Sequence, residues 1–298
     1  MTSLPQALVN VLVSVAVSNL VLTVTLNSLV IVILHRQKDL NDVSKFLYHV
    51  SASLDLAMGI AWNPWMIQWV AFGTEENCRR FTSVFVYLHR TIAICILFTV
   101  CFVSLDRYFR ITKPLHYPML VTRRRAGIGL AVAFPIIALM CTIHIPFPWF
   151  HILADVIINN CINQSIPFWT GTWANRFTTV FIVTPIFATM VILTITNLAL
   201  LRIARQQSRA IAAIGRRDFP ERPRTLFRGI GTVVLLTFPF YVCWLPWIMY
   251  LVFQEFLGAL DPLEMFGAAA SWIRPIIYIA TTREARSILR KRSCKQSF

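Results

Sequence analysis

The stretch "SLDRYFRITKPLHYP" (residues 104–118) places an acid and a base, Asp106 and Arg107, side by side at the end of an apolar run. The run extends from Phe81 to Leu105, and a helix needs about 20 mainly apolar residues to cross the hydrocarbon of a bilayer. Further basic residues follow Arg107 along the chain. The pattern therefore predicts a membrane-spanning helix whose last turn, with this charged pair, meets water.

The composition favours a membrane protein. Of the 298 residues, 57% are hydrophobic and only 14% are charged, and the mean hydropathy of +0.64 is too high for a soluble domain of this length. Backbone polar groups in lipid find no partner outside their own segment, so each spanning stretch should be helical. Seven such stretches are expected, at residues 8–34, 46–72, 81–107, 126–149, 177–204, 228–253 and 262–281. We therefore predict an all-α membrane protein, a single seven-transmembrane helix bundle over residues 1–298, with a short C-terminal amphipathic helix at residues 282–293.

The basic residues predict the orientation of the bundle. Most of the 28 lysines and arginines fall in the loops after the first, third and fifth spans and in the tail. Because positive residues near span ends are retained in the cytoplasm, the N-terminus should be extracellular and the C-terminus cytoplasmic, in a multi-pass protein of the plasma membrane. The net charge of +15 then follows from topology, with acidic lipid headgroups as neighbours, and does not indicate binding of nucleic acid.

Six motifs, in the order of the chain, resemble those of the rhodopsin-like (class A) G-protein-coupled receptors. Asp106-Arg107-Tyr108, followed by "ITKPLHYP", is similar to the end of the third helix and the second intracellular loop of that family. The other matching positions are Asn27, Asp55, Pro185, Phe240, Cys243, Trp244, Pro246, Pro275 and Tyr278. The resemblance covers nearly the whole chain and leans toward the amine receptors.

The resemblance implies a receptor that transduces an extracellular ligand signal to a heterotrimeric G protein, with arrestin and membrane lipids as further partners. Arg107 is expected to be held by Asp106 while the bundle is closed and freed when it opens. The position of a second acid that holds this arginine in many members corresponds here to Leu226, so we expect ligand-independent signalling. The expected switch residues are Asp106, Arg107, Tyr108, Pro185, Phe240, Trp244, Pro246, Pro275 and Tyr278. The alternatives are that Arg107 snorkels to the headgroups and that Trp244 serves only packing.

The seventh-helix motif departs from the family, because it begins with Arg274 where the family has asparagine. In the family, the aspartate at the position of Asp55 commonly coordinates a sodium ion, but the facing positions are here Ile92 and Ile96. We therefore predict that the guanidinium of Arg274 takes the place of the ion and pairs with Asp55. The expected buried polar core is Asn27, Asp55, Ser271 and Arg274. The alternative is that Arg274 faces lipid or the cytoplasmic vestibule and that Asp55 is protonated.

The ligand pocket also departs from the amine receptors. These receptors place an aspartate eighteen residues before the arginine of the third helix, and the residue at that place here is His89. Candidate pocket residues are His89, Arg90, Trp62, Trp65, Trp247 and Glu264, which suit an acidic or neutral ligand and not a simple amine. Glu264 also fits a helix start, since Asp261-Pro262-Leu263-Glu264 has the N-cap, proline and glutamate of a capping box.

Modification sites are expected at both faces of the membrane. By resemblance, Cys78 and Cys161 form the disulfide between the third helix and the second outer loop, and Asn163 begins the glycosylation sequon beside it. Cys294 in the basic tail is a candidate for palmitoylation, the alternative being a frayed tail with a reduced cysteine.

Other classes of protein find little support in the sequence. No P-loop, zinc-type spacing of His and Cys, or nucleophile elbow is found, so we expect no enzyme activity, no cofactor and no metal. A transporter would need several charges along a path through the membrane, and the spans carry one deep acid. A receptor-like protein that no longer signals and acts by pairing with other receptors is the main alternative, because of Arg274.

Overall fold

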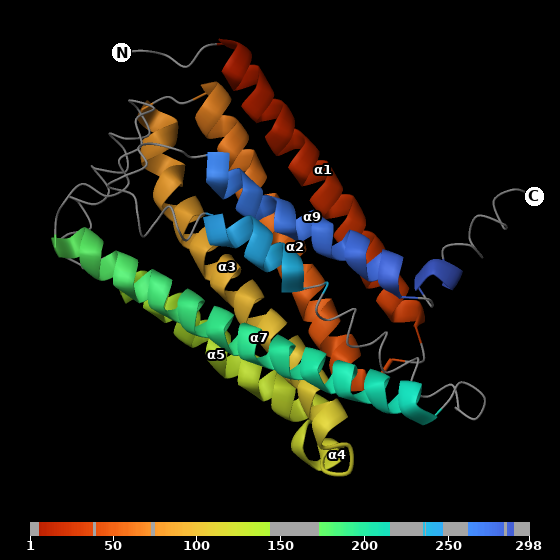
Figure 1. Cartoon of the computed structure of the whole chain (residues 1–298). Coiled ribbons are helices and arrows are strands. Elements are labelled where there is room, and N and C mark those ends of the chain that lie inside the picture. Colours follow the sequence, from red (N-terminus) through yellow and green to blue (C-terminus); the bar gives the residue numbers. More distant parts are fainter. Residues whose placement is uncertain are drawn as a thin grey trace, which may run out of the picture.

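The computed structural model describes residues 6–37, 40–72, 75–143, 173–214, 235, 237–246, 262–282 and 285–288. Within these ranges all regular structure is helical (Figure 1). The helices are α1 (Gln6–Arg36), α2 (Asp42–Phe72), α3 (Glu75–Thr112), α4 (Tyr117–Leu120), α5 (Arg123–Ile143), α7 (Trp173–Ile214) and α9 (Pro262–Thr281). Residues 237–246 are also helical. The predicted all-α architecture is confirmed.

Four of the described helices are long and apolar enough to cross a membrane. They contain the segments Val9–Arg36, Tyr87–Thr112, Arg123–Cys141 and Ile186–Gln206. Large apolar side chains face outward on α5 and α7, for example Leu139, Phe187 and Ile195. Such an apolar exterior is unusual for a protein in water, and lipid is the solvent that suits it.

Several helices extend beyond the spans expected from hydropathy. The third helix continues past Arg107 to Thr112, and α7 continues to Ile214 through a basic stretch. Hydropathy reports only the part of a helix that lies in lipid, so a helix that continues into water is longer than its apolar window. Residues 144–149 of the expected fourth span, and most of residues 228–253, lie outside the described part of the chain.

Helix α3 contacts α2, α5 and α7 and has the most buried of the four apolar windows. In the most apolar window of α3, 65% of the residues are buried, whereas only 22% are buried in the corresponding window of α5. The larger core cluster surrounds α3 and includes Met58, Ile96, Leu193 and Phe240. Short helix α4 lies at the end of the bundle where α3 and α5 meet (Figure 1). The end of α3, with Asp106 and Arg107, therefore lies beside α4.

Helices α1 and α2 approach closely at Gly59. A Cβ atom added there would lie 2.6 Å from Cγ2 of Thr23, and Thr23 is buried with its χ1 angle restricted by β-branching. Gly127 in α5 differs, because its added Cβ would meet nothing closer than Cζ of Phe46 at 3.8 Å.

We expect Gly59→Ala to destabilise the bundle by about 1–3 kcal/mol through overpacking against Thr23. The matched control Gly127→Ala should be neutral or stabilise by about 0.5–1 kcal/mol, because it removes a flexible residue from a helix without a clash. Thermal unfolding of the purified, detergent-solubilised protein measures both effects. Equal melting temperatures for Gly59→Ala and the native protein would contradict the close packing.

Candidate functional site

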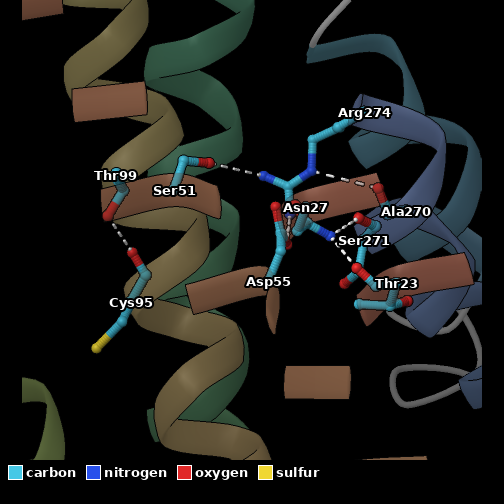
Figure 2. Close-up of polar contacts among 9 residues, drawn as sticks. All are labelled: Thr23, Asn27, Ser51, Asp55, Cys95, Thr99, Ala270, Ser271 and Arg274. Atoms are coloured by element: carbon cyan, nitrogen blue, oxygen red, sulfur yellow. Dashed lines mark hydrogen bonds and ion pairs between the residues drawn. The ribbon is translucent and has the colours of Figure 1, made fainter. Parts of the chain in front are cut away.

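The polar core begins at Pro275 in α9. Proline has no backbone N–H, so the carbonyl of Ser271, one turn earlier, loses its helical hydrogen-bond donor. The side-chain amide of Asn27 in α1 donates to this carbonyl at 2.9 Å and to the carbonyl of Thr23 at 2.9 Å (Figure 2). Asn27 therefore replaces the missing donor and joins α1 to α9.

The structure places Arg274 of α9 against Asp55 of α2, deep in the bundle (Figure 2). Nη2 of Arg274 donates to Oδ1 of Asp55, and the two side chains are only 6% and 3% exposed. Nη1 lies 3.4 Å from Oγ of Ser51, and Nε lies 3.4 Å from the carbonyl oxygen of Ala270. Because an isolated charge is very costly to bury, each partner makes the burial of the other tolerable.

The same guanidinium contacts a third helical segment. Its Cζ atom lies 5.1 Å from the ring centroid of Phe240 in residues 237–246, which is within cation–π range. One side chain of α9 therefore joins α2, α9 and this segment.

An aromatic column leads from Phe240 away from the ion pair. Phe240 stacks with Trp244 at 6.0 Å, Trp244 with His89 at 6.3 Å, and His89 with Trp62 at 3.9 Å, all measured between ring centroids. His89 and Trp62 are candidate pocket residues, so the column connects them to the polar core. His89 is only 3% exposed, and its imidazole lies between two indoles.

A cavity of about 50 Å³ adjoins the ion pair. Asp55, Arg274, Tyr48 and Tyr278 are among the residues that line it. The hydroxyl of Tyr278 donates to Oε1 of Gln37 at 2.7 Å, and its ring lies 5.3 Å from that of Tyr48. The volume suits water and not an organic ligand.

Asp106 has no direct hydrogen bond to Arg107 in the described part of the chain, although its charge acts on that guanidinium. Its carboxylate accepts hydrogen bonds from Oγ of Ser44, at 2.6 Å, and from the hydroxyl of Tyr117. Asp106 contacts α2 through Ser44 and α4 through Tyr117, while Arg107 lies over Tyr48, about one turn further along α2. The partners Ser44 and Tyr117 were missed because they belong to other elements.

Tyr117 is the centre of a cluster around Asp106. Nδ2 of Asn41 donates to its hydroxyl at 2.9 Å, and Nη2 of Arg110 lies 3.4 Å from that hydroxyl and 3.3 Å from Oγ of Ser44. Burial raises the pKa of Tyr117, and its hydrogen bond to Asp106 raises it further, while Arg110 opposes the rise. The phenol therefore stays protonated and remains a donor to Asp106.

The guanidinium of Arg107 interacts with Tyr48, Asp106 and Tyr117, but not through all of its nitrogens. Its Cζ atom lies 5.9 Å from the ring centroid of Tyr48, and its buried Nε has no hydrogen-bond partner among the described residues. An unsatisfied charged donor is costly, so this arginine is well suited to gain a partner.

The remaining expected site residues are distributed as follows. Tyr108 packs on Leu200 of α7, Pro246 ends the described part of the sixth span, and Pro185 lies within α7. The described part of the chain does not include the side chains of Arg90, Trp65, Glu264 and Cys78. It also does not include residues Trp247, Cys161, Asn163 and Cys294, or most of residues 282–293. The described cysteines, Cys95, Cys101, Cys141 and Cys243, are buried and form no disulfide.

We expect the ion pair to behave non-additively in thermal unfolding of the purified protein. Asp55→Asn leaves a buried guanidinium without a counter-charge and should cost about 3–5 kcal/mol, whereas Arg274→Met leaves a carboxyl group that can protonate. The double variant Asp55→Asn, Arg274→Met should be more stable than the sum of the two single losses predicts. Strictly additive losses would mean that the two side chains do not interact.

The sequence matches a family model and several receptors of known name. The sequence model of the 7 transmembrane receptor (rhodopsin family) matches residues 26–281. The histamine H2 receptor of Cavia porcellus is 27% identical over 231 residues, which are 73% of this chain and 60% of that receptor. The human trace amine-associated receptor 6 is 27% identical over 284 residues, 87% of this chain and 78% of that receptor. Trace amine-associated receptor 8b of Rattus norvegicus is 25% identical with the same two coverages.

Proposed function

Because the chain belongs to the rhodopsin family of seven-transmembrane receptors, we propose that it couples an extracellular ligand to a heterotrimeric G protein at the plasma membrane, with the N-terminus outside. The observation that carries the proposal is the state of Arg107. It lies near the end of α3, its Nε is buried without a partner, and Asp106 is bound elsewhere. A protein partner with acceptor groups would satisfy this arginine.

The surface beside Arg107 also suits a protein partner. Leu115 is 88% exposed and Met119 is 74% exposed, on the loop and short helix that follow α3. Arg123 and Arg124 lie just beyond them and are exposed. Exposed apolar residues with a basic rim mark an interaction surface, and a G protein, with arrestin as a second partner, is the occupant that the family favours.

The ligand is proposed to be acidic or neutral. The relatives are named for histamine and for trace amines, and an amine needs a carboxylate to pair with. At the corresponding place this chain has His89, whose imidazole is buried between Trp62 and Trp244. A buried imidazole offers no carboxylate to pair with an ammonium group, so the proposed ligand lacks a simple amine.

Ligand-independent signalling is expected because Leu226 stands where many family members have a second acid that holds this arginine. We expect a reporter assay in transfected cells to show basal signal above empty cells, and Arg107→Ala to reduce that signal at least tenfold at equal surface expression. The control is Arg36→Ala, which removes an exposed arginine in the last turn of α1 and should signal as the native receptor does. Native receptor at the cell surface that gives no basal signal through any G-protein reporter would contradict the expectation.

A second candidate function rests on the ion pair of Asp55 and Arg274. By joining α2, α9 and residues 237–246, the pair could hold the bundle in one state, and the protein would then act by pairing with other receptors. In that case Arg107→Ala would leave unchanged any effect of co-expression on the signalling of a partner receptor.

The ion pair also predicts insensitivity to sodium. A guanidinium already neutralises Asp55, so a diffusible cation has no charge to compensate there. We expect the melting temperature and basal signal to be equal in sodium chloride and choline chloride of the same ionic strength. A sodium-specific change that disappears in Asp55→Ala would show that an ion, and not Arg274, occupies this place.

A further inference from the structure

Two histidines meet where α1 ends and α2 begins. His35 lies in the last turn of α1 and His49 in the second turn of α2, and Nδ1 of His35 is 3.1 Å from Nε2 of His49. We propose that this pair is a binding site for a divalent transition-metal ion of the zinc class. The proposal goes beyond the signalling function and does not depend on it.

The backbone selects the tautomer that a metal requires. Nδ1 of His49 lies 2.8 Å from the carbonyl oxygen of Lys45. A carbonyl oxygen only accepts, so Nδ1 carries the proton and Nε2 of a neutral His49 presents its lone pair toward His35. A second hydrogen bond of this kind is the usual support for a metal-binding histidine.

The spacing of the two rings matches a shared ion. With nitrogens about 2.0–2.1 Å from a tetrahedral zinc ion, the two nitrogens lie about 3.3 Å apart and the ring centres about 5.2 Å apart. The structure has 3.1 Å between the nitrogens and 4.9 Å between the ring centroids, with the rings tilted by 39°. A straight N–H···N hydrogen bond of this length would separate the ring centres by roughly 5.4 Å. The arrangement therefore departs from a straight N–H···N hydrogen bond and is close to that of two imidazoles on one ion.

The surroundings leave the site open to solvent. His35 is exposed and His49 is half-buried. No group of three or more His, Cys, Asp or Glu side chains able to hold a metal is present in the part of the chain that the structure describes. Two imidazoles would thus bind the ion, and water would complete its coordination. Lys45, the nearest cation along α2, directs its Nζ to the carbonyl oxygen of Gln37 at 3.0 Å, away from the imidazole that its own carbonyl orients.

Ligand type sets the selectivity of the site. Imidazole nitrogen suits Zn²⁺, Cu²⁺ and Ni²⁺, whereas Mg²⁺ and Ca²⁺ prefer oxygen ligands. The bound ion would bridge α1 and α2 beside Gln37, whose side chain accepts the hydroxyl of Tyr278. Metal binding should therefore stabilise the junction of the first two helices.

The test uses the full-length receptor, purified in detergent and stripped of metal with EDTA. We expect ZnCl₂ to raise the melting temperature in a dose-dependent manner that EDTA reverses, and MgCl₂ to have no effect. His35→Ala and His49→Ala should each weaken the apparent Zn²⁺ affinity at least tenfold. The matched control is His116→Ala, which removes an exposed histidine at the N-cap of α4 and should leave the affinity unchanged.

Three outcomes would overturn the site: no response to Zn²⁺ in the native receptor, an equal response in His35→Ala, or an equal loss in His116→Ala. His35→Ala is the decisive variant, because His35 is exposed and its removal should leave the metal-free melting temperature unchanged. Since the readout is stability, a receptor that fails to signal would still reveal whether the metal binds.

Discussion

The buried ion pair of Asp55 and Arg274 is the constraint on which the core of this receptor depends. Neither charge can be buried alone, so α2 and α9 must be packed with the two side chains in register. Pro275, the next residue, exposes a carbonyl that only Asn27 of α1 satisfies in the described structure. Adjacent residues of α9 therefore fix its position against two different helices, and Phe240 adds a third contact to the same guanidinium.

Asp106 and Arg107 lie near the end of α3, beside the short helix α4. Asp106 and Arg107 are neighbours on α3, and the hydrogen bonds of the carboxylate go to Ser44 and Tyr117. The acid thereby holds α4 and the start of α2 against α3. Arg107 lies over Tyr48, and its Nε has no hydrogen-bond partner among the described residues. Asp106 therefore joins helices, whereas Arg107 keeps a nitrogen that a partner could bind.

Much of the architecture could be predicted from the sequence, because lipid allows a long apolar segment few forms other than a helix. The contact of Arg274 with Asp55 was also predictable, since few ionisable residues occur in the spans and a buried charge needs an opposite one. The partners of Asp106 were not, because Ser44 and Tyr117 are ordinary polar residues on separate elements. His35 and His49 gave no signal either, since their proximity depends on how α1 packs against α2 and not on a local spacing.

The covalent attachment of the cation in the core has a consequence for the response to membrane voltage. A free ion that enters or leaves a buried site moves charge through the transmembrane field, at about 2.3 kcal/mol per elementary charge per 100 mV. Arg274 cannot leave, and with Asp55 it forms a unit of no net charge. Rearrangement of this core therefore moves almost no net charge through the membrane field. A change in membrane potential should have little effect on its equilibrium.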